Sequence, residues 1–159
     1  MNHFVLIESN TTGTGAIIVE RLLARGDKVS FLTRTPEKYP FLAFKDPALE
    51  IRNVDTNCFA TVIKTIQEIH VQQAVNAVVT TSEFYVPLVA QVATALGLPG
   101  LDPVAAQTCR HKPSTRKKLR AAGLLTPDFY IVNGEKEAEE IAARIEYPCV
   151  VKPPSDSSS

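Results

Sequence analysis

Two lysines carry the clearest chemical signal in this sequence, and Lys152 is the first. It follows the apolar run of residues 149–151 and precedes Pro153, Pro154 and a polar tail rich in serine. Such a run is typical of a buried strand, and an unpaired ammonium group at its exit must reach either water or an anion. Small residues beyond a proline can offer amide and hydroxyl donors to phosphate, but these residues alone leave open whether Lys152 reaches water or lies at an anion site.

Lys112 is the second candidate. It lies within residues 103–127, a stretch that contains six lysine and arginine residues and no acidic one. Pro113 disfavours helical geometry at Lys112 and favours a new helix after it, so the lysine side chain can be aimed at a ligand. Arg116 and Arg120 lie one helical turn apart on the same face. These residues alone leave a solvated helix face and an anion site equally open.

A glycine turn, NTTGTG at residues 10–15, follows the first apolar run. A turn between a strand and a helix can place backbone amides beside a phosphate. Gly13 and Gly15 fit the first glycines of the dinucleotide fingerprint, but Ile18 occupies the third place. Arg34 could then meet the 2′-phosphate of NADP. The alternative interpretation is a tight turn that closes the first strand–helix unit and binds no nucleotide.

The elements that must position these residues alternate between strand and helix. Short β-rich runs predict strands over residues 3–9, 28–34, 50–56 and 76–81. Apolar residues at helical spacing predict helices over residues 16–26, 57–71 and 85–97. Ile17 belongs to the apolar stripe of the first helix, and Asn57 can cap the second. This alternation predicts an α/β domain with a Rossmann-like parallel sheet and flanking helices.

The pattern changes after residue 101. Asp102 and Pro103 favour a helix start, because an aspartate can cap and a proline suits the first helical position. Helices are expected over residues 114–123 and 135–145, and strands over residues 128–132 and 148–152. We expect this incomplete α+β piece to begin a second domain. Its last helix carries a polar face that we interpret as solvated, formed by Glu135, Glu137, Glu139 and Glu140.

Composition excludes several classes of protein. The 159 residues are 45% hydrophobic and 21% charged, and Lys+Arg 17 against Asp+Glu 17 leave no net charge. No global field draws such a chain to nucleic acid or to an anionic membrane, and no apolar run approaches a membrane span. Nucleic-acid binding is further disfavoured because residues 101–125 contain no aromatic side chain to stack on a base. Three distant cysteines show no metal-ligand spacing and indicate a cytoplasmic protein.

Together the two lysine motifs resemble the entrance of the ATP-grasp fold. The stretch RHKPSTRKKLRAAGLLTPDFYIV, an amphipathic helix and YPCVVKPPSDSSS follow that family's order of elements. The resemblance implies that Lys112 and Lys152 contact ATP phosphates. It also implies that a covering loop contains the serines, namely Ser155, Ser157, Ser158 and Ser159. The segments LIESNTTGTG and ALGLPGLDP are similar to the pre-ATP-grasp domain of carboxylate–amine ligases and carbamoyl-phosphate-synthase-like proteins.

The resemblance implies a division of the chain and a function. Residues 1–101 would form the pre-ATP-grasp domain, residues 102–127 linking helices, and residues 128–159 the start of the ATP-grasp small subdomain. We expect a truncated, N-terminal fragment of an ATP-dependent carboxylate–amine ligase that works through an acyl phosphate and is inactive alone. Magnesium would bind in the intact enzyme, since its ligands belong to a lobe that this chain lacks. The covering loop usually contains glycine, and here serines replace it.

Two other functions fit parts of the sequence. An NAD(P)-binding Rossmann oxidoreductase would explain the glycine turn and Arg34, but not Lys112 or the Lys152 motif. A non-catalytic α/β binding module would use Lys117 and Lys118 to dock an acidic partner. We also expect unpaired strand edges after residue 127 either to favour a homodimer or to leave the C-terminal residues poorly ordered.

Overall fold

The computed structural model describes residues 1–11, 13–43 and 45–156. Their contacts divide the chain into two compact units, Met1–Ala106 and Gln107–Ser159. The first unit contains a β-sheet with helices on both faces. The described part of the second unit contains helices joined by extended segments. The finer division at residues 101/102 and 127/128 stays a prediction.

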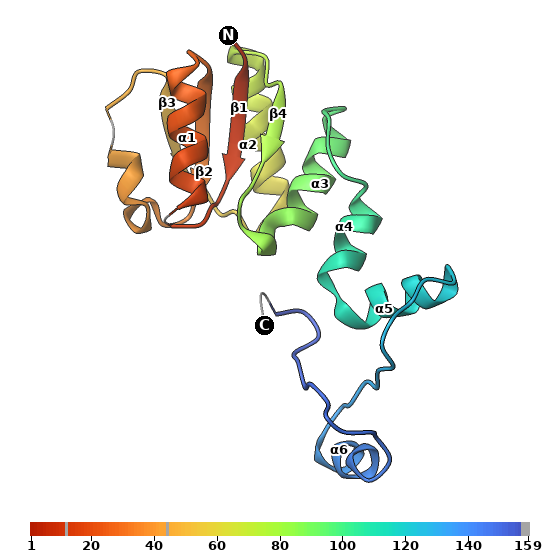
Figure 1. Ribbon diagram of the computed structural model, residues 1–159. Helices are drawn as coiled ribbons and strands as arrows, with labels where there is room; N and C mark the ends of the chain where they lie inside the picture. The colour runs from red at the N-terminus through yellow and green to blue at the C-terminus, as the bar shows by residue number, and fades with distance from the viewer. Residues whose placement is uncertain (12, 44, 157–159) are drawn as a thin grey trace. The chain divides into compact units, whose positions relative to one another are not determined.

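The first unit is built on a four-stranded parallel sheet in the order β3-β2-β1-β4 (Figure 1). Its strands are β1 His3–Ile7, β2 Lys28–Thr33, β3 Leu49–Asn53 and β4 Ala77–Val79. The two central strands are nearly continuous buried runs, as expected of parallel strands covered on both faces. The predicted parallel α/β sheet is therefore confirmed.

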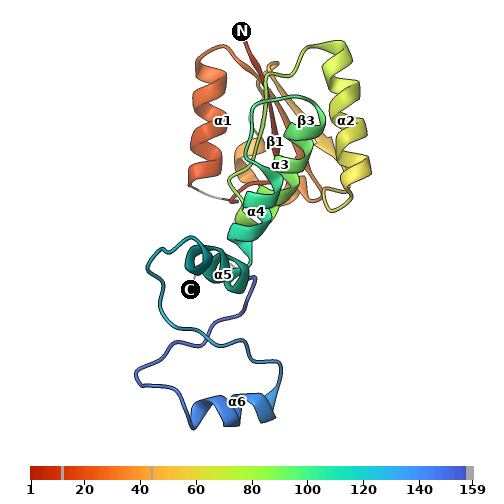
Figure 2. The same ribbon diagram turned by 90° about the vertical axis from the view of Figure 1, so that its right-hand side faces the viewer.

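Helices cover both faces of this sheet (Figure 2). Helix α1 Thr14–Ala24 packs on one face, where Leu6 and Phe31 are fully buried. Helices α2 Phe59–Gln72 and α3 Val86–Ala95 pack on the other face. Short 3-10 turns join these elements at Pro36–Lys38, Pro40–Ala43 and Glu83–Tyr85.

Two details of the sequence prediction are wrong. Ile17 is 54% exposed and does not belong to the buried stripe of α1, where Val19 is fully buried. Asn57 does not cap α2, because the N-cap position is Cys58. The amide oxygen of Asn57 instead accepts a hydrogen bond from the Tyr85 hydroxyl at 3.1 Å.

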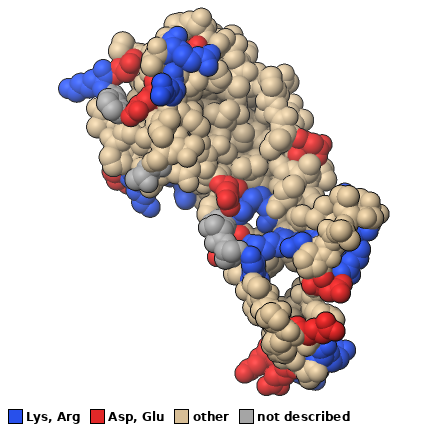
Figure 3. Space-filling view, in the orientation of Figure 1, with Lys and Arg blue, Asp and Glu red and all other residues tan. Residues whose placement is uncertain are grey.

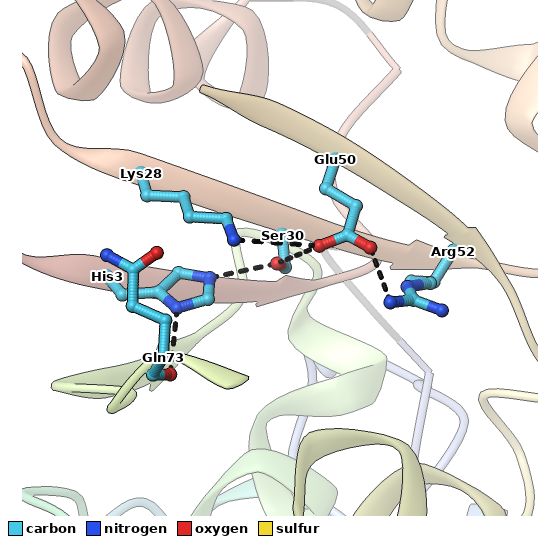
Figure 4. A network of polar contacts seen from close by, with 6 residues as sticks. All are labelled: His3, Lys28, Ser30, Glu50, Arg52 and Gln73. Atoms are coloured by element: carbon cyan, nitrogen blue, oxygen red, sulfur yellow. Dashed lines mark hydrogen bonds and ion pairs between the residues drawn. The ribbon is translucent and has the colours of Figure 1, made fainter. Parts of the chain in front are cut away.

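A polar network crosses the sheet on the face that α2 covers (Figure 4). The fully buried His3 places Nε2 2.9 Å from Ser30 Oγ, and its Nδ1 lies 3.3 Å from the carbonyl oxygen of Gln73. Ser30 Oγ lies 3.4 Å from Glu50 Oε2, and Arg52 forms an ion pair with the same carboxylate. Burial lowers the pKa of His3 below its ordinary value of 6.5. The network therefore holds a neutral imidazole in the interior.

The helices of the remaining chain are α4 Pro103–Arg110, which crosses the boundary between the units, α5 Lys112–Ala121 and α6 Glu135–Ala142. The strands expected at residues 128–132 and 148–152 are wrong, because no β-ladder is assigned in the described residues 107–156. Val150 is 78% exposed and Val151 93% exposed, so this run is not buried either. A strand needs a neighbour to satisfy its amides and carbonyls, and sequence alone does not supply one.

Within the described residues, the structure contains no helix that is both long and apolar enough to cross a membrane.

Candidate functional site

Lys112 contacts the segment that follows Lys152. Lys112 is the first residue of α5, and its backbone amide donates to the carbonyl oxygen of Pro154 at 2.9 Å. Its ammonium group donates to the carbonyl oxygen of Asp156 at 2.7 Å. Two stretches that are more than forty positions apart in the chain therefore meet within the second unit.

Arg110 adds a second cation to this contact. Its guanidinium Nη2 donates to the carbonyl oxygen of Ser155 at 2.9 Å, next to the residue that Lys112 holds. Arg110 belongs to the basic stretch of residues 103–127 but is not among the predicted site residues. The available signal was its place two residues before Lys112 in a stretch without acidic side chains.

Of the other predicted site residues, the structure describes two, Lys152 and Ser155. Lys152 is exposed and lies two residues before Pro154, so their α-carbons are at most roughly 7 Å apart. Ser155 is exposed, and its carbonyl oxygen rather than its hydroxyl makes the recorded contact with Arg110. The predicted ligands Ser157, Ser158 and Ser159 lie outside the described residues.

Arg116 and Arg120, the two arginines expected on one face of α5, both contact the segment that follows this helix. Arg116 Nη1 donates to Thr126 Oγ1 at 3.0 Å, and Arg120 Nη2 pairs with Asp128 at 2.9 Å. The Arg120 guanidinium also lies 5.3 Å from the centre of the Phe129 ring. This face of α5 therefore holds the extended segment that follows the helix, which leaves Lys112 and Arg110 for a different role.

Positive charge gathers on the part of the second unit that carries α5 (Figure 3). The helix has no acidic residue in its first turn. Guanidinium groups, ammonium groups and a helix N-terminus all favour anions, so the chemistry of this donor set fits phosphate oxygens. In the described part of the chain, no three His, Cys, Asp or Glu side chains are arranged to hold a metal. The four glutamates of α6 are exposed, as expected.

A buried carboxylate joins the carboxyl ends of three strands in the first unit. Glu8 follows β1 and is 5% exposed. Its Oε1 accepts hydrogen bonds from Thr56 Oγ1 at 2.7 Å and from the Arg34 amide at 3.0 Å. Its Oε2 accepts from Thr33 Oγ1 at 2.8 Å and from the Tyr39 hydroxyl. One side chain thus ties the end of β1 to the residues that follow β2 and β3.

These hydrogen bonds decide the charge of Glu8. Burial alone would raise the pKa of this carboxyl, but the bonds from Tyr39, Thr56, Arg34 and Thr33 outweigh it and lower the pKa below 4.5. Burial, together with the bond to Glu8, raises the pKa of Tyr39 to about 12. Glu8 is therefore an ionised acceptor and Tyr39 a neutral donor. Glu8 is not among the residues predicted from the sequence, although an acidic residue directly after an apolar strand was the available signal.

The glycine turn has a packing reason. A β-carbon on Gly15 would lie 1.9 Å from Ser9 Oγ and 2.6 Å from the Asn10 carbonyl oxygen, so only glycine lets α1 start against the end of β1. Thr81, two residues after the end of β4, holds the turn through contacts of its Oγ1 with Ser9 Oγ at 2.7 Å and the Asn10 amide at 3.0 Å. The turn is accounted for without a bound nucleotide.

Comparison with known proteins adds to this geometry. The family model of the ATP-grasp N-terminal domain matches residues 26–100. The uncharacterized protein y4rH of Sinorhizobium fredii is 26% identical over 164 residues, which cover 98% of this chain and 34% of that protein. A D-alanine–D-alanine ligase of Thermoanaerobacter sp. strain X514 is 38% identical over 65 residues, which cover 38% of this chain and 18% of the ligase.

Two solved structures are also similar to this chain over most of its length. The L-amino acid ligase of Bacillus licheniformis matches with a TM-score of 0.77 and 27% identity, over 98% of this chain and 38% of the ligase. The biotin carboxylase domain of Hydrogenobacter thermophilus 2-oxoglutarate carboxylase matches with a TM-score of 0.55 and 17% identity, over 91% of this chain and 33% of that chain, and shows the fold alone. The chain thus spans about a third of the relatives that match its whole length. Residues 26–100 thus match the N-terminal domain of the ATP-grasp superfamily, within a chain that is similar to an L-amino acid ligase over 98% of its length.

Proposed function

We propose that this chain supplies the first part of the ATP site of a carboxylate–amine ligase. The carrying observation is the 2.9 Å bond from the Lys112 amide to the Pro154 carbonyl oxygen. It brings the lysine that begins α5 to the loop that follows Lys152. Similarity to an L-amino acid ligase over 98% of this chain supports the same reaction class.

Each residue has a proposed role in binding ATP. Lys112 and Lys152 offset negative charge on the triphosphate, and Ser155, Ser157, Ser158 and Ser159 belong to the loop that covers it. Phosphoryl transfer depends mainly on positioning and on charge neutralisation, which fixed cations supply. Magnesium would share that task in the intact enzyme, held by residues outside this chain.

The proposed reaction has two steps. A substrate carboxylate takes the γ-phosphoryl group of ATP and becomes an acyl phosphate, while ADP leaves. An amine then attacks the acyl carbon, and inorganic phosphate leaves as the amide bond forms. The sheet domain, residues 1–101, would be the pre-ATP-grasp domain, followed by linking helices over residues 102–127 and the start of the ATP-grasp small subdomain over residues 128–159.

Residues 1–159 alone are proposed to bind ATP weakly and to form no amide, because they supply only one wall of the nucleotide site. We also propose that the intact enzyme is cytoplasmic and that its substrates are a small carboxylate and a small amine. We further propose that it forms a homodimer. A coupled assay that detects ATP-dependent amide formation by this chain would overturn the proposed inactivity.

ATP titration by calorimetry tests the binding site. Lys112→Gln and Lys152→Gln should each weaken ATP binding about tenfold, since each removes a charge-assisted contact with a phosphate. Lys117→Gln is the matched control, because Lys117 is an exposed lysine on the same helix. Equal affinity in all three variants would contradict the assignment of the two lysines.

A further inference from the structure

Three donors, one from the last residue of α4 and two from the first residue of α5, are engaged by three successive carbonyl oxygens. The Lys112 amide contacts Pro154 at 2.9 Å, Arg110 Nη2 contacts Ser155 at 2.9 Å and Lys112 Nζ contacts Asp156 at 2.7 Å. We call residues 154–156 the strap. Since the three acceptors are consecutive in the chain, the three donors all face one short stretch of backbone.

The strap takes the place of a helix cap. His111 occupies the N-cap position of α5 and makes no side-chain cap hydrogen bond. The first amides of a helix have no acceptor within the helix, so Lys112 must find one elsewhere. The recorded acceptor is the strap carbonyl of Pro154. The strap therefore satisfies hydrogen-bond donors that would otherwise attract an anion to the N-terminus of α5.

The strap is also easy to displace. Its contacts with Arg110 and with the Lys112 ammonium are exposed, so water competes with the carbonyl oxygens. A phosphate oxygen is negatively charged, and a hydrogen bond to it is roughly twice as strong as one to a neutral carbonyl oxygen. A polyphosphate can offer several such oxygens to the same three donors at once.

We propose that the strap and the phosphates of the nucleotide compete for Arg110 and Lys112. The structure holds the strapped state, and a nucleotide binds only when residues 154–156 leave these donors. Arg110 is thereby a third phosphate ligand. The inference rests on the proposed function, because it takes Lys112 as a phosphate ligand. It adds that the strap must leave Lys112 and Arg110 before these residues can bind phosphate.

Titration of the full chain with inorganic tripolyphosphate tests this competition. Pro154→Gly gives the detached strap more conformational freedom and should raise tripolyphosphate affinity about two- to fivefold. Pro127→Gly is the matched control, an exposed proline of the same unit outside the strap, and should leave the affinity unchanged. If Pro154→Gly binds with equal or lower affinity, the strap does not compete and the proposal fails.

Hydrogen exchange of the Lys112 amide gives an independent measurement. In the free chain this amide should be protected, although it is the first residue of a helix, and Pro154→Gly should speed its exchange by a similar factor. An unprotected Lys112 amide in the unsubstituted chain would overturn the proposal.

The outcomes separate this inference from the proposed function. If Lys112→Gln weakens tripolyphosphate binding but Pro154→Gly does not strengthen it, the strap proposal fails and the proposed function stands. Failure of the unsubstituted chain and of Pro154→Gly to bind tripolyphosphate or ATP would reject the proposed function, and the strap with it.

Discussion

Replacing Glu8 by glutamine tests whether one carboxylate holds the strand ends together. Glu8 accepts four hydrogen bonds while it is ionised. A bond to a charged acceptor contributes about 1.5 kcal/mol and one to a neutral acceptor about 1 kcal/mol, so Glu8→Gln loses about 1 kcal/mol from the two bonds that its amide oxygen keeps and about 3 kcal/mol from the two that its amide nitrogen cannot accept. The lower cost of burying a neutral group offsets about 1 kcal/mol of this loss.

We therefore expect Glu8→Gln to lower the free energy of unfolding by about 3 kcal/mol at neutral pH. Urea denaturation followed by far-ultraviolet circular dichroism measures this, since the chain has no tryptophan. Glu20→Gln, an exposed carboxylate on α1, is the matched control and should change stability by less than about 0.5 kcal/mol.

The pH dependence sharpens this test. The folded-state pKa of Glu8 is lowered, so its stabilisation is complete above pH 4.5 and is lost as the pH falls through the folded-state pKa. The difference between Glu8→Gln and the unsubstituted chain should shrink over that range. A difference under about 0.5 kcal/mol at neutral pH, or one that does not change with pH, would refute the reasoning.

Three further changes have defined outcomes. The pKa of His3 is lowered by burial, so stability should fall as the pH drops below 6.5, and urea midpoints of His3→Gln should lack this slope. Gly15→Ala should destabilise the first unit by about 2–3 kcal/mol in thermal unfolding, because its β-carbon would overlap Ser9 and Asn10; an unchanged midpoint would contradict the packing role. Arg120→Ala should cost under about 1 kcal/mol, since its ion pair with Asp128 is exposed, yet raise hydrogen exchange at residues 126–129; exchange that rises equally in α6 would argue against a local role.

The sheet could be predicted from the sequence because its signals are local. Apolar runs and helical spacing identify β1, β2, α1 and α2 without reference to the rest of the chain. The expected strand at residues 148–152 failed for the complementary reason. Its apolar residues have strand character, but a ladder needs a partner at a distance, and Val151 is instead 93% exposed.

The candidate site was only partly predictable. Pro113 indicates a new helix near Lys112, but the prediction that Lys112 lies outside that helix is wrong, because α5 begins at Lys112. Family resemblance joins Lys112 to Lys152. Nothing in local spacing indicates that carbonyl oxygens of residues 154–156 would contact Arg110. Glu8 was missed because its four donors come from residues 33 to 56 and meet only when the parallel strands end at one edge.

The strand order has a consequence for synthesis on the ribosome. Strand β1 is made first, yet one of its two neighbours, β4, is Ala77–Val79. A nascent chain that has released only β1 to β3 still lacks β4, so one side of β1 has no strand to pair with. This strand gains its second partner only when Val79 has emerged, so a pause in translation before that point would prolong the exposure of an apolar strand edge.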